Sequence, residues 1–316
     1  MISTVTLNPA LDKTIYISKL APNDTNRVTN VETDAGGKGI NCSRMLQRLG
    51  VETAALAFLG GDTGDFIKMV VEKAGVALDY VQTDRPTRTC VAVEESANVP
   101  ATTFNERGGP IEHKELVAML EKVKDVSRRS KYMVFGGSVP TGVNQDVYRV
   151  MIEIAQAGGA KSVLDADGEA LVEGLKAKPF MIKPNRDEAE RLLGVQFESI
   201  ADVARGALSL AERGIELVII SLGKQGAVAC YEKVIYYAAT PAVKVVSTIG
   251  SGDSLTAGIL WALESGKTIQ DALKAGCAAG AATAMSNGVD IGSKEDVDRL
   301  ISEVKVTITE PAAKND

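Results

Sequence analysis

At residues 248–254 the sequence reads Thr248-Ile249-Gly250-Ser251-Gly252-Asp253-Ser254, and Leu255, Ile259 and Leu263 follow at helical spacing. The pattern predicts a strand at 243–247, a glycine turn and a buried helix. The first amides of such a helix have no carbonyl partners within it, so they favour an anion. Two interpretations follow: Asp253 is a general base beside an anion hole, or it simply caps the helix.

The composition excludes several classes of protein. The chain has 316 residues and a net charge of −6, which disfavours general binding to nucleic acid or to an anionic membrane. No apolar run approaches the roughly 18 residues of a membrane span, and the first residues lack the pattern of a secretory signal. We therefore expect a cytoplasmic protein.

The cysteines and the histidine limit the possible chemistry. Cys42, Cys90, Cys230 and Cys277 are far apart and form no C-x-x-C pair, so we expect buried thiols rather than disulfides or a zinc site. His113 is the single histidine, in the polar start of a predicted helix. A Ser/His/Asp triad or a multi-histidine metal site is therefore close to excluded.

Strands and helices alternate along most of the chain. Further strands are predicted at 2–7, 53–59, 131–135, 161–165, 180–183, 217–221 and 227–234. Helices are predicted at 36–50, 63–74, 112–128, 144–157, 186–193 and 200–213, followed by three between 253 and 304 with breaks at Gly266 and at Asn287-Gly288. This order implies a mostly parallel sheet covered on both faces, with ligands beyond the carboxyl ends of its strands. We expect residues 305–316 to form a frayed end.

Four short strands, at 14–17, 27–33, 87–93 and 102–105, lack intervening helices. They predict a small separate sheet, either a lid or a dimer surface, built from segments at about 12–34 and 86–106. Arg27 and Arg88 lie in these segments, where either guanidinium could bind a phosphate or simply face solvent.

The turn Gly36-Gly37-Lys38-Gly39-Ile40-Asn41 could place amides, an ammonium and a side-chain amide around a polyhydroxylated ligand, or it could be a tight loop with an exposed lysine. The chain contains neither a P-loop nor a G-x-G-x-x-G sequence. Any ATP site must therefore follow another design, and a dinucleotide-dependent oxidoreductase is disfavoured.

Two later motifs each allow two interpretations. Asn185 and Glu188, after Lys183-Pro184, have the spacing of a capping box, but they could also hold a hydrated Mg²⁺ while Lys183 contacts phosphate oxygens. The segment 221–227 could be a glycine hairpin or a backbone contact to a nucleotide.

Taken in order, these four motifs resemble the PfkB (ribokinase-like) family of sugar kinases over essentially the whole chain. The segments 6–12 and 36–41 resemble the branch that phosphorylates phosphorylated ketohexoses. The resemblance implies a single domain, residues 1–316, with a ribokinase-like three-layer αβα fold and a small β-sheet lid. It also implies a homodimer through the lid, with ATP and Mg²⁺ as cofactors. Ser247 stands where many relatives have Asp, which leaves a monovalent cation open.

The resemblance implies a role for each site residue. Asp253 would be the base, and Gly250, Ser251 and Gly252 the anion hole. Sugar hydroxyls would contact Asp12, Gly37 and Asn41, and the substrate's phosphate would contact Lys38, Arg27, Arg88 and Ser138. Mg·ATP would contact Lys183, Asn185, Glu188, Ser221, Gly223 and Gly226, with the metal held by Glu188 and, through water, by Asn185.

The implied reaction converts fructose 1-phosphate to fructose 1,6-bisphosphate. The alternative is tagatose 6-phosphate to tagatose 1,6-bisphosphate, which the strand at 87–93 favours. A non-catalytic sugar-phosphate or nucleotide sensor is a third, remote alternative. Because Asp253 would lie near a helix N-terminus, we expect its pKa to be lowered.

Overall fold

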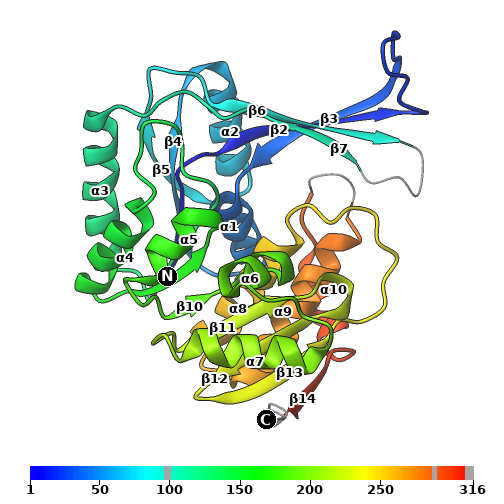
Figure 1. The fold of residues 1–316 in the computed structure, drawn as a ribbon. Helices are drawn as coiled ribbons and strands as arrows, with labels where there is room; N and C mark the ends of the chain where they lie inside the picture. Colours follow the sequence, from blue (N-terminus) through cyan, green and yellow to red (C-terminus); the bar gives the residue numbers. More distant parts are fainter. Residues whose placement is uncertain (96–100, 287–289, 310–316) are drawn as a thin grey trace.

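The computed structural model describes residues 1–95, 101–286 and 290–309 and contains two sheets (Figure 1). The main sheet has ten strands in the order β14-β13-β12-β11-β10-β9-β8-β1-β4-β5. Its parallel part comprises β1 (Ile2–Thr6), β4 (Thr53–Leu59), β5 (Ala77–Gln82), β8 (Tyr132–Gly136), β9 (Lys161–Asp165), β10 (Met181–Ile182) and β11 (Leu217–Ser221). An antiparallel edge follows, made of β12 (Ala227–Tyr231), β13 (Val234–Ala239) and β14 (Lys305–Thr309).

Helices cover both faces of the main sheet because its strands are apolar on both sides. In β8, Met133 and Phe135 belong to one core cluster and Tyr132 and Val134 to the other. The first face carries α3 (His113–Ser127), α4 (Val147–Ala157), α5 (Gly168–Leu175), α6 (Arg186–Leu193) and α7 (Ile200–Ala211). The second face carries α1 (Lys38–Arg48), α2 (Gly61–Lys73), α8 (Ser251–Glu264), α9 (Ile269–Ala284) and α10 (Lys294–Ile301). The predicted three-layer αβα fold is confirmed.

The small sheet has four strands in the order β3-β2-β6-β7. These are β2 (Ala10–Ile17), β3 (Val28–Gly36), β6 (Arg88–Glu95) and β7 (Thr102–Asn105), and they extend away from the main body (Figure 1). Val31 and Phe104 on this sheet are 45% and 60% exposed, so part of its apolar surface faces solvent. Residues 96–100, within the predicted segment 86–106, lie outside the described residues.

Some predictions for individual segments were wrong. Residues 243–247 form no strand: the amides of Val246 and Ser247 donate to the carbonyl of Ala284, and Val245 is 53% exposed. The β-branched run therefore lacks the burial that would have made it a strand. Residues 305–309 are not frayed but form β14, because the edge strand β13 offers them free backbone groups.

Besides β14, three elements were not foreseen: β5, α5 and β13. The predicted break at Asn287-Gly288 and the rest of the C-terminal segment, 310–316, lie outside the described residues. Within the described ranges, no helix is both long and apolar enough to cross a lipid bilayer.

Candidate active site

The site residues gather at the carboxyl ends of the parallel strands. Asn8 follows β1, Ser138 follows β8, Asp165 ends β9 and Lys183 follows β10. The glycine turns that open α1 and α8 lie at the same edge, since Asn41 and Asp253 are joined by a hydrogen bond. This is the edge at which open α/β sheets bind ligands.

The turn before α8 provides unpaired donors. Gly250 is the N-cap residue, in the left-handed conformation at φ 72°. The amide of Ser254 donates to the Gly250 carbonyl at 2.9 Å, so the amides of Gly252 and Asp253 precede the first bond of the helix. The Ser251 hydroxyl is buried and has no hydrogen-bond partner among the described residues. Such a turn is suited to an anion that approaches the helix axis.

Asp253 does not cap α8, so the simple capping interpretation is wrong. It lies in the first turn of the helix and is 9% exposed, and its Oδ2 accepts a hydrogen bond from Asn41 Nδ2 at 2.9 Å. Burial, followed by the charge of Asp165, raises the pKa of Asp253 to about 7 despite Asn41, Lys183 and Lys38. The expected lowering by the helix N-terminus is therefore also wrong, because these two effects outweigh it. A carboxylate with this pKa is suited to general-base catalysis near neutral pH.

The turn before α1 requires glycine for steric reasons. A Cβ on Gly36 would lie 1.9 Å from Asp12 Oδ2, and Gly37 has φ 127°. The Asp12 carboxyl group is thus packed across the turn, where only glycine fits at position 36. Burial raises the pKa of Asp12 to about 6, although Arg88 acts to lower it.

Two lysines share one buried carboxylate beside these turns. Asp165 Oδ1 accepts from Lys38 Nζ at 2.8 Å, and its Oδ2 lies 2.9 Å from Lys183 Nζ. Although burial opposes both shifts, the pKa of Lys38 is raised by Asp165, and the pKa of Asp165 is lowered by the two lysines. Asp165 was missed at the sequence level; the available signal was a carboxylate at the end of an apolar strand.

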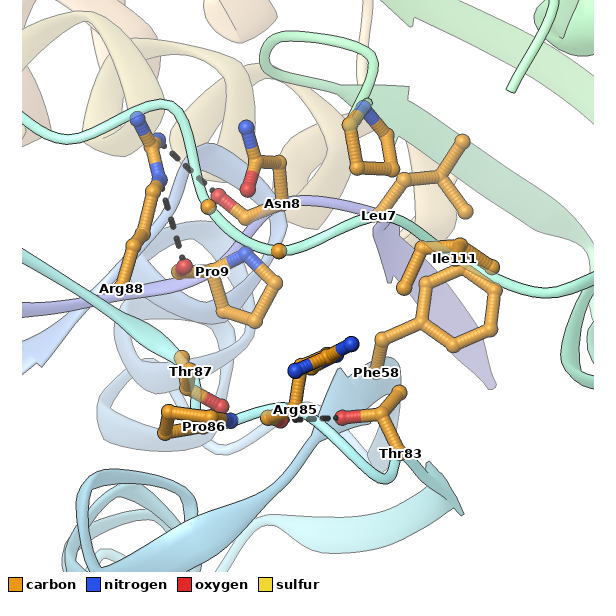
Figure 2. A pocket seen from close by; sticks show the side chains of 13 residues that line it. Leu7, Asn8, Pro9, Phe58, Thr83, Arg85, Pro86, Thr87, Arg88 and Ile111 are labelled. Carbon is orange, nitrogen blue, oxygen red and sulfur yellow. Dashed lines mark hydrogen bonds between the residues drawn. The ribbon is translucent and has the colours of Figure 1, made fainter. Parts of the chain in front are cut away.

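Arg88 lies at the start of β6 and connects the small sheet to the loop after β1. Figure 2 shows its guanidinium donating to the carbonyls of Asn8 and Pro9, at 3.0 and 3.4 Å. A third bond reaches the Glu106 carbonyl at 2.8 Å. Asn8 in turn donates to the Ser138 hydroxyl at 3.0 Å, so the predicted residues Arg88 and Ser138 lie around the same loop.

Arg88 borders two hollows of very different size. The hollow in Figure 2, which also contains Arg85, has a volume of about 30 Å³, enough for about two water molecules. The other is lined by Asn8, Ser138 and Arg107 as well as Arg88 and has a volume of about 450 Å³. The larger hollow is within the usual size range of small-molecule pockets, roughly 300–1,000 Å³.

Arg107 was missed by the sequence reasoning, although it follows a predicted strand and precedes two glycines. Among the described residues nothing pairs with its guanidinium, and its carbonyl accepts from Asn8. Arg27, by contrast, lies away from this pocket. The β2–β3 register pairs Ala10 with Gly36 and Ile17 with Val28, which puts Arg27 about 25 Å along the strands from the glycine turn.

Asn185 and Glu188 form the predicted capping box at the start of α6. Glu188 Oε2 accepts from the Asn185 amide at 2.7 Å, and Asn185 Oδ1 accepts from the Glu188 amide at 2.8 Å. In the described part of the chain, no group of three or more His, Cys, Asp or Glu residues could hold a metal ion. A divalent ion here would therefore keep most of its waters, which is the usual behaviour of Mg²⁺.

The segment 221–227 is the predicted hairpin between β11 and β12. Ser221 forms an isolated parallel bridge with Asn185, the N-cap residue of α6, and the exposed residue Gly223 starts a short 3₁₀ turn. Gly226 is buried, and a Cβ there would lie 1.9 Å from the Ala238 carbonyl. Packing against β13 is thus sufficient reason for glycine at position 226.

The four cysteines are free thiols; Cys42, Cys230 and Cys277 are buried as expected, whereas Cys90 is only half-buried. His113 is exposed at the start of α3.

Comparison with known proteins identifies the family. The model of the pfkB family carbohydrate kinases matches residues 5–296. The chain is 35% identical to 1-phosphofructokinase of Borreliella burgdorferi, over 97% of this chain and 98% of that protein. It is 33% identical to 1-phosphofructokinase of Bacillus subtilis, over 97% and 99%.

Among solved structures, phosphofructokinase-2 from Escherichia coli in complex with potassium superposes with a TM-score of 0.90 at 28% identity, covering 96% of this chain and 98% of that one. The chain therefore belongs to the pfkB family of carbohydrate kinases, phosphotransferases that act on an alcohol group of a sugar.

Proposed function

We propose that this kinase transfers the γ-phosphoryl group of ATP to the free primary hydroxyl of fructose 1-phosphate, producing fructose 1,6-bisphosphate. Asp253 accepts the proton of the attacking hydroxyl, and the amides of the Gly250–Asp253 turn receive the charge that develops on the phosphoryl group. The two full-length relatives named 1-phosphofructokinase support this choice of substrate.

The observation that carries the proposal is a continuous row of polar groups. It begins at Asp253, which is bonded to Asn41, and continues through the Gly36–Gly37 turn to Asp12. Asp12 faces Arg88, which borders the 450 Å³ pocket. A base at one end and a cationic pocket at the other suit a sugar that carries its phosphate away from the reacting hydroxyl.

In this arrangement Asp12, Gly37 and Asn41 contact the sugar hydroxyls. Lys38 pairs with Asp165 at 2.8 Å and faces Asp253, so it lies by the transferred phosphoryl group rather than by the phosphate expected for it. Arg88 and Ser138 bind the phosphate the substrate already carries. We add Arg107 to this group, because it lines the pocket and its guanidinium has no partner among the described residues. Arg88 donates to three carbonyls, so it also holds the pocket wall in place.

The nucleotide and the metal would bind on the other side of the turn. Lys183, Ser221 and Gly223 would contact ATP, and Gly226 would shape the hairpin. Glu188 and, through water, Asn185 would hold Mg²⁺; the absence of a larger acidic cluster in the described chain fits an ion that needs only one or two carboxylates. When bound, the ion would neutralise charge on the phosphate oxygens. Ser247, where many relatives have Asp, is buried, and its hydroxyl accepts from the Ile249 amide at 3.3 Å.

A homodimer through the small sheet is part of the proposal. Val28, Val31 and Phe104 are 49%, 45% and 60% exposed on this sheet, and a second copy would cover them. Because Arg27 lies about 25 Å along the strands from its own glycine turn, it would reach a phosphate only in such an assembly. Both substrates are cytoplasmic metabolites, so we place the enzyme in the cytoplasm.

Steady-state kinetics of the purified protein with Mg·ATP test the substrate. We expect the highest kcat/KM on fructose 1-phosphate, compared with fructose 6-phosphate and tagatose 6-phosphate. A higher value on tagatose 6-phosphate would favour the tagatose 6-phosphate kinase reaction. No turnover on any phosphosugar would favour a sensor instead.

A further inference from the structure

Asp165 lies in the active site but has no role in the proposed reaction so far. It ends β9, near the middle of the main sheet, and its side chain is 3% exposed. Its two oxygens contact different ammonium groups, Lys38 at 2.8 Å and Lys183 at 2.9 Å. One buried carboxylate therefore bridges two cations that are far apart in sequence.

The two lysines come from opposite sides of the site. Lys38 is the first residue of α1, in the turn assigned to the sugar, and Lys183 precedes the motif assigned to Mg·ATP. A Cβ on Gly252 would lie 3.4 Å from Lys183 Nζ, so this ammonium lies against the anion turn. Lys38 lies over the end of β8, because a Cβ on Gly136 would be 3.2 Å from the Cβ of Lys38.

We propose that Asp165 is a positioning residue for phosphoryl transfer, whose carboxylate holds Lys38 and Lys183 together beside the Gly250–Asp253 turn before the reactants bind. A lysine ammonium on a flexible four-carbon stem has no fixed place by itself. Cations that are already in place stabilise the phosphoryl group without reorganisation during the reaction. This inference rests on the proposed kinase reaction.

Asp165 also acts on the base. The Asp253 carboxyl group faces Asp165, Lys38, Lys183 and the buried Cys42 thiol, and it is bonded to Asn41. After burial, the Asp165 charge is the largest contribution that raises the pKa of Asp253. Loss of that charge should therefore lower the pKa of the base, which a loss of packing alone would not do.

The test is Asp165→Asn, measured on whichever phosphosugar the wild-type enzyme phosphorylates, so that an error in the assigned substrate does not affect it. We expect kcat to fall by about 100-fold, as for other displacements of reacting groups by about an ångström. KM should change much less, and the acid limb of the pH profile of kcat/KM should move to lower pH.

The matched control is Glu216→Gln. It removes the exposed ion pair between Glu216 and Lys161, 3.5 Å apart, at the opposite end of β9. We expect wild-type kcat and an unchanged pH profile for this variant.

Two results would overturn the inference. One is an Asp165→Asn enzyme with wild-type kcat and an unshifted acid limb. The other is recovery of wild-type kcat at saturating Mg²⁺, which would make Asp165 a metal ligand rather than an anchor for the lysines.

Because Asp165→Asn leaves Lys183 buried without its partner, thermal melting must first show that the variant folds. Asp165→Glu gives a second route, since it keeps the charge but moves the carboxylate by one methylene. We expect about a tenfold lower kcat with the acid limb in its wild-type place. Full wild-type kcat in Asp165→Glu would equally overturn the inference.

Discussion

The two sides of this active site differ in how their charges are held. Around Asp253 the charged groups contact one another and are largely buried: the side chains of Asp165 and Lys183 are 3% and 6% exposed, and that of Lys38 is 33% exposed. On the side of the small sheet, Arg27 is exposed, and the Arg88 guanidinium donates hydrogen bonds to backbone carbonyls of the loop after β1. The charges of the buried side are held in place within one chain. The small sheet, in contrast, has an exposed apolar surface that a second chain would cover in the proposed dimer.

The difference suggests a division of labour. Buried, mutually paired charges act on the reacting atoms, because a low local dielectric strengthens each interaction. Exposed cations around a pocket act mainly on binding, since water screens them. Substitutions on the buried side should therefore lower kcat, and those on the pocket side should raise KM.

The largest expected effect is on the buried side. Asp253→Asn keeps the shape of the side chain and its bond from Asn41 but cannot accept the proton. We expect kcat to fall by about 10²–10⁴-fold, the usual contribution of a general base, with KM for the phosphosugar little changed. Steady-state and single-turnover kinetics measure this, and near-normal turnover would remove Asp253 from its assigned role.

On the pocket side, Arg107→Ala should raise KM for the phosphosugar by about 10–100-fold while leaving kcat nearly unchanged. A hydrogen bond to a charged group contributes about 1.5–3 kcal/mol, which sets this range. Initial-rate measurements at saturating ATP determine both constants. Arg85→Ala is the matched control, since Arg85 lines only the small 30 Å³ hollow next to the pocket. An equal rise of KM in both variants would argue against a specific phosphate contact by Arg107.

Arg88→Ala is expected to give a less selective result. It should raise KM, but it also removes three bonds to backbone carbonyls and so should lower thermal stability. An unchanged KM would exclude Arg88 from the substrate site. The comparison with Arg107→Ala then separates phosphate binding from support of the loop.

The pH dependence of kcat/KM tests the buried side of the active site through Asp253. Because burial and Asp165 raise the pKa of Asp253 to about 7, the free enzyme holds its base protonated in mild acid. We expect kcat/KM to fall about tenfold per pH unit below pH 7 and to level off above it. Asp12 also has a raised pKa, of about 6, and Asp12→Asn removes that titration. We expect the acid limb of this variant to keep the wild-type midpoint. A midpoint near pH 4 would show that Asp253 is not shifted.

What could be predicted from the sequence follows the same division. The glycine turns before α1 and α8 and the capping box at Asn185 are local patterns, and each was found where expected. The order of strands and helices was sufficient to predict the three-layer fold. Local pattern could not reveal Asp165, whose role depends on two lysines that meet only in the folded chain.

Other failures have related physical causes. The pKa of Asp253 was misjudged because burial cannot be judged from a motif. The run at 243–249 has strand-like residues, but Val245 and Val246 in its middle are exposed, and 305–309 pairs only because β13 offers an edge. The place of Arg27 in a working site depends on a second chain in the proposed dimer, which no pattern within one chain describes.

The smallest expected effect concerns stability, and it tests the buried charge without any substrate. Asp253 has a folded pKa near 7 against 3.8 for an ordinary Asp, so the folded state binds more protons than the unfolded state between about pH 4 and 7. Its contribution to stability is full below pH 4 and is lost as the pH rises to 7. Asp253→Asn has no such loss, so its melting temperature should exceed that of the wild type by a margin that grows from pH 4 to pH 7, reaching a few degrees. In Asp12→Asn the corresponding margin should stop growing near pH 6. Calorimetry across this range checks both variants, and a margin for Asp253→Asn that shrinks with rising pH would mean that the carboxylate is stabilised, not strained, in its ionised form.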